Sequence, residues 1–210
     1  MNKDIIPAII AKNQEELDKR IETLRGIANT MQLDVMDDAF VPNRSLDFDF
    51  SVPKGIDFEG HLMVQDPARW LQKHMDKIRT VLVHAESGAD IDSLSEQMRG
   101  AGKRFGIALN PETPLDTISK YIGRLDELLI MTVNPGFYGS PFVPSALDKV
   151  KEARARMPDI DIEVDGSIND ETISDASKAG ANLFVVGSYL QKARDIGQRH
   201  KDLKKLMEDL

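Results

Sequence analysis

Residues 33–43 are Leu-Asp-Val-Met-Asp-Asp-Ala-Phe-Val-Pro-Asn, an apolar run that ends in carboxylates and a turn-forming Pro-Asn pair. The pattern predicts a buried strand that delivers acidic side chains to its carboxyl end. Asp34 lies between Leu33 and Val35, so its carboxylate needs a metal ion, a hydrogen-bond donor or a substrate as partner. An aspartate at a strand end can also be purely structural and cap the next turn. This segment alone leaves open whether Asp34 is a functional carboxylate or such a cap.

Outward from this segment, short apolar runs alternate with amphipathic stretches along the chain. The apolar runs predict strands at residues 5–10, 31–36, 60–64, 81–85, 105–109, 128–133, 160–164 and 183–186. Helices are expected between them, at residues 13–28, 67–77, 91–101, 145–157, 169–179 and 189–210. Another helix is expected to begin at Pro114, with Thr113 as its N-cap.

This alternation predicts parallel strands covered by helices, and the eight expected strands favour a closed (β/α)8 barrel of the TIM type. An open doubly wound sheet is the alternative. Residues 40–59 break any helical period with Asp47, Asp49, Pro53 and Gly55, so the second helix is expected to be reduced to a loop. One barrel domain is expected across residues 1–210.

Composition limits the classes of function. The chain has 41% hydrophobic residues, enough for a sizeable core, and no cysteine for disulfides or thiolate metal sites. A net charge of −8 argues against nucleic acid and anionic membranes as partners. Residues 1–11 are too short an apolar patch for a membrane span, so a cytoplasmic protein is expected. An apolar stripe in the last helix suggests a homo-oligomer, and it comprises Leu203, Leu206, Met207 and Leu210.

Polar residues collect where the predicted strands end. Such ends meet at one rim of a barrel, which is where barrel enzymes place their chemistry. The residues are Asp34, His61, His84, Glu86, Asn110, Asn134, Asp165 and Ser188. A single polar strand end is usually structural, but this concentration indicates an active site.

Gly-Ser pairs follow the last two predicted strands, at Gly166-Ser167 and Gly187-Ser188. Such turns expose backbone N–H groups at a helix start, which is the recurrent phosphate site of barrels. Gly139-Ser140 could add a further donor loop. The turns predict how an acidic protein binds a phosphorylated ligand through local dipoles.

Several segments together resemble the motifs of ribulose-phosphate 3-epimerases, in order and in spacing. The resemblance covers about residues 6–191. The segments are Leu33 to Asp37, Phe40 to Asn43, His61 to Val64, Asn110 to Pro114, Met131 to Phe137 and Glu163 to Ser167. The Asn-Pro-Glu-Thr-Pro and Val-Asp-Gly-Ser forms are similar to the allulose-6-phosphate 3-epimerase branch.

The resemblance implies a barrel enzyme that inverts the carbon next to a ketone through an enediolate. It implies that Asp34 and Asp165 are the acid/base pair and that both, with His61, bind a divalent cation of the Zn, Mn, Fe, Co or Mg type. Such chemistry needs a base, an acid and a cation that stabilises the oxyanion. The residues that line the substrate pocket would be Met36, Met63, His84, Met131, Asn134 and Gly136, and plain barrel core is the less favoured alternative for the methionines.

Departures from the family pattern fall on the functional rim. Gln32 replaces a histidine ligand and offers only a weak amide ligand, and Ala8 replaces a serine that touches substrate. The metal is therefore expected to be weakly bound or absent. The alternatives are a non-catalytic barrel that binds a sugar phosphate and a different barrel enzyme acting on a phosphorylated ligand. No lysine is expected on the rim, which argues against Schiff-base chemistry.

Overall fold

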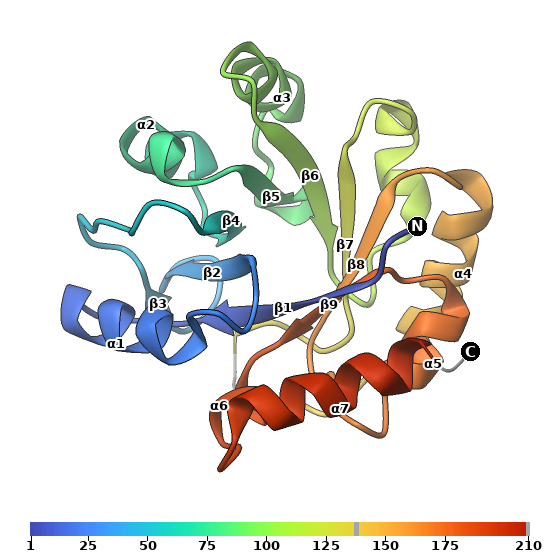
Figure 1. The fold of residues 1–210 in the computed structure, drawn as a ribbon. Helices are drawn as coiled ribbons and strands as arrows, with labels where there is room; N and C mark the ends of the chain where they lie inside the picture. The colour runs from blue at the N-terminus through green and yellow to red at the C-terminus, as the bar shows by residue number, and fades with distance from the viewer. Residues whose placement is uncertain (137–138, 209–210) are drawn as a thin grey trace.

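The structure is a computed structural model that describes residues 1–136 and 139–208. Within these residues, eight parallel strands form a ring that helices surround, as Figure 1 shows. The first strand pairs with both the second and the last, in parallel, so the sheet closes on itself. The predicted (β/α)8 barrel is confirmed, and the open doubly wound sheet is excluded.

The elements follow one another in the expected alternation. The parallel strands are β1 (Asp4–Ile9), β2 (Thr30–Asp37), β4 (Asp57–Met63), β5 (Thr80–His84), β6 (Arg104–Leu109), β7 (Glu127–Met131), β8 (Asp161–Asp165) and β9 (Leu183–Val186). The α-helices are α1 (Gln14–Leu24), α2 (Pro67–His74), α3 (Ile91–Gly100), α4 (Ala146–Arg156), α5 (Ile173–Ala179), α6 (Ser188–Gln191) and α7 (Ile196–Glu208). Short 3₁₀ helices are η1 (Met75–Lys77), η2 (Ala85–Ser87) and η3 (Leu115–Tyr121).

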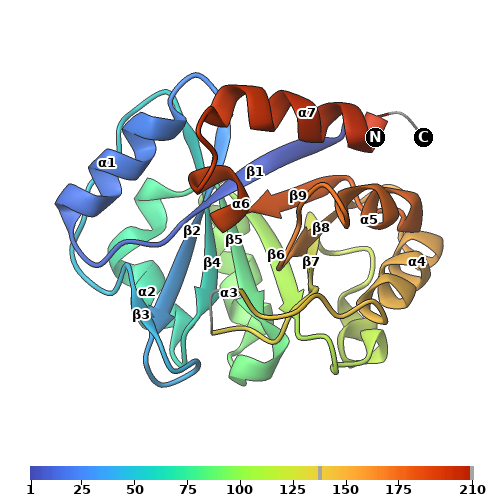
Figure 2. The ribbon, with the colours of Figure 1, turned by 90° about the horizontal axis from the view of Figure 1, so that it is seen from below.

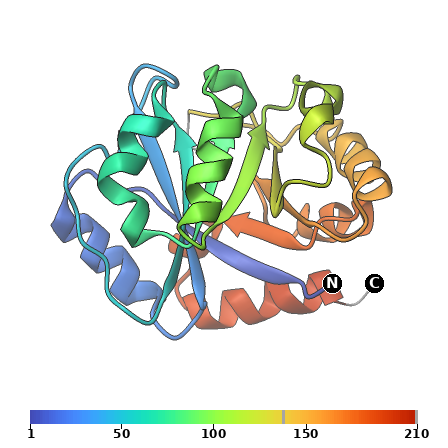
Figure 3. The ribbon, with the colours of Figure 1, turned by 90° about the horizontal axis from the view of Figure 1, so that it is seen from above.

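Side chains of the strands alternate between two environments. Outward-facing residues such as Ile5, Leu33 and Val35 belong to the large core beneath the helices. The barrel interior holds a smaller apolar cluster that includes Ile6, Leu129 and Val185. Figures 2 and 3 show the helices lying over the outer side of the strands.

Local signals explain where several helices begin. Asn13 caps α1 by accepting a hydrogen bond from the Glu16 N–H, and Asp66 caps α2 immediately before Pro67. Helix α1 buries Leu17, Ile21 and Leu24, which recur at helical spacing. These caps and periods are the reason that most helix positions follow from the sequence.

Three details differ from expectation or refine it. No helix lies between β2 and β4, where the fully described segment instead contains β3 (Arg44–Ser45), paired antiparallel with β2. The expected helix start at Pro114 is wrong in detail, because the element is a 3₁₀ helix that begins at Leu115. The Thr113 hydroxyl donates to Glu86 instead of capping that helix. Helix α5 begins at Ile173, four residues later than expected.

The last helix packs against its own barrel. Leu203 and Met207 are fully buried, Leu206 is 37% exposed, and Leu210 lies outside the described residues. The Lys3 ammonium donates to the Met207 carbonyl at 2.7 Å, so the beginning of the chain lies beside the end of α7. Most of this apolar stripe therefore packs against the barrel of the same chain. The stripe gives no support for the expected homo-oligomer, which stays a prediction.

Among the described residues, no helix combines the length and the apolar character needed to cross a membrane.

Candidate active site

Three of the predicted residues converge at the carboxyl ends of β2, β4 and β8. Asp34 and His61 are direct partners in the β2–β4 register. The His61 Nδ1 lies 3.4 Å from the Asp34 Oδ1 and 3.3 Å from the Asp165 Oδ2. One potential ligand atom from each residue lies within 4.8 Å of the others, so the group could hold a metal ion.

Gln32 lies in the middle of this group. Its Nε2 donates to the Asp34 Oδ1 at 2.8 Å and to the Asp165 Oδ2 at 2.9 Å, and it lies 3.5 Å from the His61 Nδ1. The side chain is fully buried and its Oε1 has no hydrogen-bond partner. The amide of Gln32 thus bridges the two carboxylates through its nitrogen while leaving a buried oxygen unsatisfied.

The charges of the group are mutually dependent. Burial raises the pKa of Asp34, and the neighbouring Asp165 adds to this rise, while hydrogen bonding to His61 opposes it. Burial disfavours the charged form of His61, but the two aspartates outweigh burial and raise its pKa to about 9. The site therefore holds a carboxyl that tends to keep its proton beside an imidazole that tends to carry one.

A chain of side chains behind His61 fixes the orientation of its ring. The His61 Nε2 lies 2.9 Å from the His84 Nε2, and the His84 Nδ1 lies 3.1 Å from the Glu86 Oε2. Burial lowers the pKa of His84 to about 4, so this ring is neutral and carries its proton on Nδ1, where Glu86 accepts it. The His84 Nε2 must then accept from His61, which leaves the His61 Nδ1 to face the aspartates.

Glu86 is itself held as a carboxylate. It accepts hydrogen bonds from the Asn110 backbone N–H at 2.8 Å and from the Thr113 hydroxyl. Burial opposes its charge, but the bonds from His84, Thr113 and Asn110 outweigh burial and lower the pKa of Glu86 to about 2. The two strand-end residues Glu86 and Asn110 therefore support the site without facing a ligand.

A cavity of about 370 Å³ opens above the aspartates. Asp34, Asp165 and Ala8 line it together with most of the predicted pocket residues. The latter are Met36, Met63, Met131, Gly136, Gly139, Ser140, Gly166, Ser167, Gly187 and Ser188. The two carboxylates are accessible from this cavity, since 10% of the Asp34 side chain and 16% of the Asp165 side chain are exposed.

Two predicted pocket residues, His84 and Asn134, lie outside the lining, and so does the predicted metal ligand His61. His61 and His84 are fully buried beneath the floor of the cavity, and Asn134 is exposed to solvent. The structure thus places His84 where it contacts His61. Phe137, part of the quoted motif, lies outside the described residues.

Backbone geometry at the rim requires glycine at one position in particular. Gly166 has φ +124°, and a Cβ there would lie 2.5 Å from a Val133 methyl group and 2.9 Å from the Val133 backbone nitrogen. Ser167 follows with φ +52° and donates from its hydroxyl to the Ser140 carbonyl. This turn therefore brings the loops after β7 and β8 together at the cavity.

Two cations at the cavity were not predicted from the sequence. Lys192 and Arg199 line it beside Ser188, and the Arg199 guanidinium stacks over the Tyr189 ring at 4.3 Å. Both follow the last strand in the segment of α6 and α7, away from any strand end. The sequence feature that could have identified them is that basic residues follow shortly after the Gly187-Ser188 pair. A bound anion would thus meet side-chain charge as well as backbone dipoles.

The residues present fit a divalent cation. Two carboxylates and an imidazole nitrogen face one point, and the unsatisfied Gln32 Oε1 is the oxygen that a turn of the amide would bring to the same point. Such an oxygen-rich donor set suits magnesium, manganese and related ions better than soft ones.

The family of the chain follows from comparison with known proteins. Residues 4–191 match the model of the Ribulose-phosphate 3 epimerase family. The chain belongs to this family. Curated ribulose-phosphate 3-epimerases of Mycobacterium tuberculosis and Bacillus subtilis are each 35% identical to it. Both cover 91% of this chain, and the matches span 87% and 93% of those proteins. The ribulose-phosphate 3-epimerase of Aquifex aeolicus is 32% identical, covering 98% of this chain and 97% of its own.

Solved structures with low sequence identity share the fold of this family member. KGPDC of Streptococcus mutans superposes with a TM-score of 0.70 at 8% identity, covering 100% of this chain and 99% of its own. A mutant tryptophan synthase α-subunit of Pyrococcus furiosus gives a TM-score of 0.69 at 18% identity, with 100% of both chains covered. The likeness supports the barrel, and the family match identifies the chain as an epimerase-type isomerase.

Proposed function

We propose that the protein inverts C3 of a ketose phosphate, either ribulose 5-phosphate or allulose 6-phosphate, through an enediolate. The observation that supports this most is the convergence of Asp34 and Asp165 from separate strands on the floor of one cavity. An epimerisation next to a ketone needs one group to remove the C3 proton and another to return a proton to the opposite face.

In the proposed mechanism Asp165 acts as the base and Asp34 as the acid. Burial raises the pKa of Asp34, which favours this carboxyl for the role of the acid. Asp165 takes the proton from C3, and the electron pair of the C–H bond forms the C2–C3 double bond while the ketone oxygen gains the negative charge. Asp34 then gives its proton to the other face of C3, and the carbonyl re-forms. The reverse reaction exchanges the two roles.

His61, Asp34, Asp165 and, through its amide oxygen, Gln32 would hold a divalent cation at this site. When bound, the cation supplies Lewis-acid stabilisation of the charge that develops on the ketone oxygen. Gln32 bridges the two carboxylates by hydrogen bonds when its nitrogen faces them. The methionines Met36, Met63 and Met131 exclude water from the carbon skeleton.

The phosphate is proposed to bind the loops that follow the last strands. Gly166, Ser167, Gly187 and Ser188 in these loops line the cavity, as do Gly139 and Ser140. Lys192 and Arg199 add positive charge there, which offsets the net charge of −8 for a dianionic group.

Proton exchange at C3 tests the proposal. Ribulose 5-phosphate and allulose 6-phosphate are incubated with the protein in D₂O, with and without added Mn²⁺, and loss of the C3 proton signal is followed by NMR. We expect exchange with at least one substrate, and its loss in Asp34→Asn and Asp165→Asn. Asp38→Asn is the matched control, because Asp38 is exposed next to the same strand end and its φ of +64° suits asparagine.

A non-catalytic barrel that binds a sugar phosphate is the second candidate. It is favoured by the hydrogen bonds that Gln32 makes to both carboxylates and by Ala8 at the position of a family serine. In that case both sugar phosphates bind in calorimetry, but no C3 exchange occurs under any metal condition.

A further inference from the structure

The two carboxylate oxygens of Glu86 contact different groups. Its Oε1 accepts hydrogen bonds from the Asn110 backbone N–H at 2.8 Å and from the Thr113 hydroxyl. Its Oε2 lies 3.1 Å from the His84 Nδ1. Since a carboxylate can only accept, His84 must carry its proton on Nδ1. The side chain at residue 86 therefore determines the tautomer of the His84 ring.

The position of the His84 proton determines where His61 carries its own. The Nε2 atoms of the two rings lie 2.9 Å apart, and both rings are fully buried. Two nitrogens at this distance need one proton between them. Because the neutral His84 ring holds its proton on Nδ1, the shared proton belongs to the His61 Nε2. The His61 Nδ1, which faces Asp34 and Asp165, can then offer its lone pair to a cation.

The turn that contacts the Glu86 Oε1 is held in place from two sides. Within residues 110–113, the Thr113 N–H donates to the Asn110 carbonyl at 3.1 Å. The Lys149 ammonium, on α4, donates to two carbonyl groups of this turn at 2.6 and 2.9 Å. The two donors that face the Oε1 are therefore fixed, and they require an acceptor at that position.

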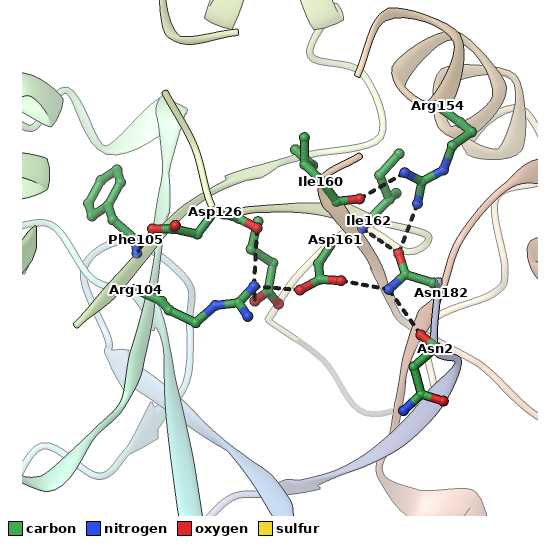
Figure 4. Close-up of polar contacts among 10 residues, drawn as sticks. Asn2, Arg104, Phe105, Asp126, Arg154, Ile160, Asp161, Ile162 and Asn182 are labelled. Atoms are coloured by element: carbon green, nitrogen blue, oxygen red, sulfur yellow. Dashed lines mark hydrogen bonds and ion pairs between the residues drawn. The ribbon is translucent and has the colours of Figure 1, made fainter. Parts of the chain in front are cut away.

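An amide at the amino-terminal rim shows how fixed partners orient a carboxamide. The Asn182 Oδ1 accepts from the Ile162 backbone N–H and from Arg154, both at 2.8 Å. The Asn182 Nδ2 donates to the Asp161 carboxylate at 2.8 Å, as Figure 4 shows. A backbone N–H and a second donor thus select the oxygen of an amide and direct its nitrogen to the remaining acceptor.

We propose that Glu86 is a positioning residue that sets the tautomer of His61 through His84, so that the His61 Nδ1 faces the cation site with a lone pair. The substitution Glu86→Gln, of nearly the same shape, should reverse this arrangement. The fixed donors of the turn would keep the amide oxygen, and the amide nitrogen would take the place of the Oε2. This inference rests on the cation site of the proposed function but not on catalysis.

The reversal in Glu86→Gln would pass along both histidines. The amide N–H would donate to the His84 Nδ1, so the His84 proton would move to Nε2. The His61 Nε2 would then accept from His84, and His61 would carry its proton on Nδ1. A proton would thus occupy the position at which a cation binds.

The protonated nitrogen of His84 tests the proposal without metal or substrate. Long-range ¹H–¹⁵N correlation spectra of the metal-free protein identify this nitrogen, and the chain has only four histidines to assign. We expect the proton on Nδ1 in the unmodified protein and on Nε2 in Glu86→Gln. The opposite tautomer in either protein overturns the inference. The spectrum of the unmodified protein decides the matter even when Glu86→Gln does not fold.

Calorimetric titration with Mn²⁺ tests the consequence for the cation site. Glu86→Gln should weaken Mn²⁺ binding about 10- to 100-fold, the usual range for a group that orients a histidine ligand. Glu112→Gln makes the same substitution at an exposed position of the same turn, and this matched control should leave binding unchanged. Equal affinity of Glu86→Gln and the unmodified protein, or no Mn²⁺ binding by either, contradicts the proposed role of Glu86.

Thr113→Val separates reversal of the tautomer from loosening of the turn. It removes one donor to the Glu86 Oε1 and keeps the carboxylate, so His84 should keep its proton on Nδ1. The loss of Mn²⁺ affinity should then be smaller than in Glu86→Gln, and an equal loss would assign the effect to the turn and overturn the inference. Absence of C3 exchange would leave the tautomer measurement unaffected, so the two proposals can fail independently.

Discussion

At the scale of single residues, the side chain of Gln32 determines how tightly the site binds a cation. Its nitrogen now bonds both aspartates, and a bound cation needs its oxygen instead. We predict that Gln32→His tightens binding of Zn²⁺ or Mn²⁺ at least tenfold and raises the C3 exchange rate, because an imidazole is a stronger ligand than an amide. Calorimetry and the NMR exchange assay measure the two effects.

Gln32→Leu is the matched variant, since it keeps the approximate volume and removes both amide groups. It should weaken metal binding and leave Asp34 and Asp165 without their shared donor. Tighter metal binding in Gln32→Leu than in the unmodified protein would contradict the assignment of Gln32 as a ligand.

His74 provides a residue-scale prediction about pH. Its ring stacks on Phe50 at 4.6 Å and lies 4.8 Å from the Trp70 ring, and it is 3% exposed. Burial lowers its pKa to about 4, with Lys77 adding to the effect. The unfolded chain binds this proton near the ordinary value of 6.5, so the free energy of unfolding falls as pH drops from about 6.5 to about 4.

The slope from this one group is at most about 1.4 kcal/mol per pH unit. His74→Phe keeps an aromatic ring against Phe50 and removes the titration. Urea denaturation of both proteins across this pH range should show a difference that grows in favour of the variant as pH falls. A difference that is independent of pH would show that His74 does not titrate as described.

At the scale of elements, the turn after β8 is the most constrained part of the rim. Gly166→Ala should destabilise the protein by roughly 3 to 5 kcal/mol, because the new methyl group overlaps Val133 in addition to the backbone strain of φ +124°. Gly88→Ala is the control, with φ +70° and open space around it, and should cost only about 1 kcal/mol. Equal losses in urea denaturation would exclude the steric explanation.

The elements also show which features the sequence could predict. Strand positions followed from apolar runs, and the rim followed from polar residues at strand ends. The resemblance to the epimerase motifs then singled out Asp34, His61 and Asp165 among those residues. The buried group of Glu59, Glu127 and Glu163 inside the barrel could not be predicted, because these residues lie within strands and meet only when the barrel closes. Lys192 and Arg199 were missed for a related reason, since α6 and α7 bring them to the cavity by folding back across the rim.

The predicted helix start at Pro114 was wrong because two groups compete for the hydroxyl of Thr113. Thr113 and Pro114 form a common helix start, yet the Thr113 hydroxyl is used by Glu86. A side chain that supports the site through Glu86 and His84 is not available as a cap. Local patterns are least reliable where a residue serves the functional site.

At the scale of the whole molecule, the ring of strands closes between β1 and β9, and α7 covers this closure. Leu203 and Met207 are fully buried, and both the Lys3 ammonium and the Ser177 hydroxyl donate to the Met207 carbonyl. The helix thus ties the first strand to α5 near the end of the chain. Stability of the barrel should depend on the inner face of α7 much more than on its outer face.

Paired substitutions on the two faces of α7 test this dependence. Leu203→Ala should lower the free energy of unfolding by about 2 to 5 kcal/mol, since it leaves a cavity in the core. Leu206→Ala, at a side chain that is 37% exposed, should stay within about 0.5 kcal/mol if the protein is a monomer. Urea denaturation measures both, and sedimentation measures the mass of each variant. If Leu206→Ala instead destabilises the protein and halves its mass, the outer face of α7 contacts a second copy, and the homo-oligomer expected from the sequence is restored.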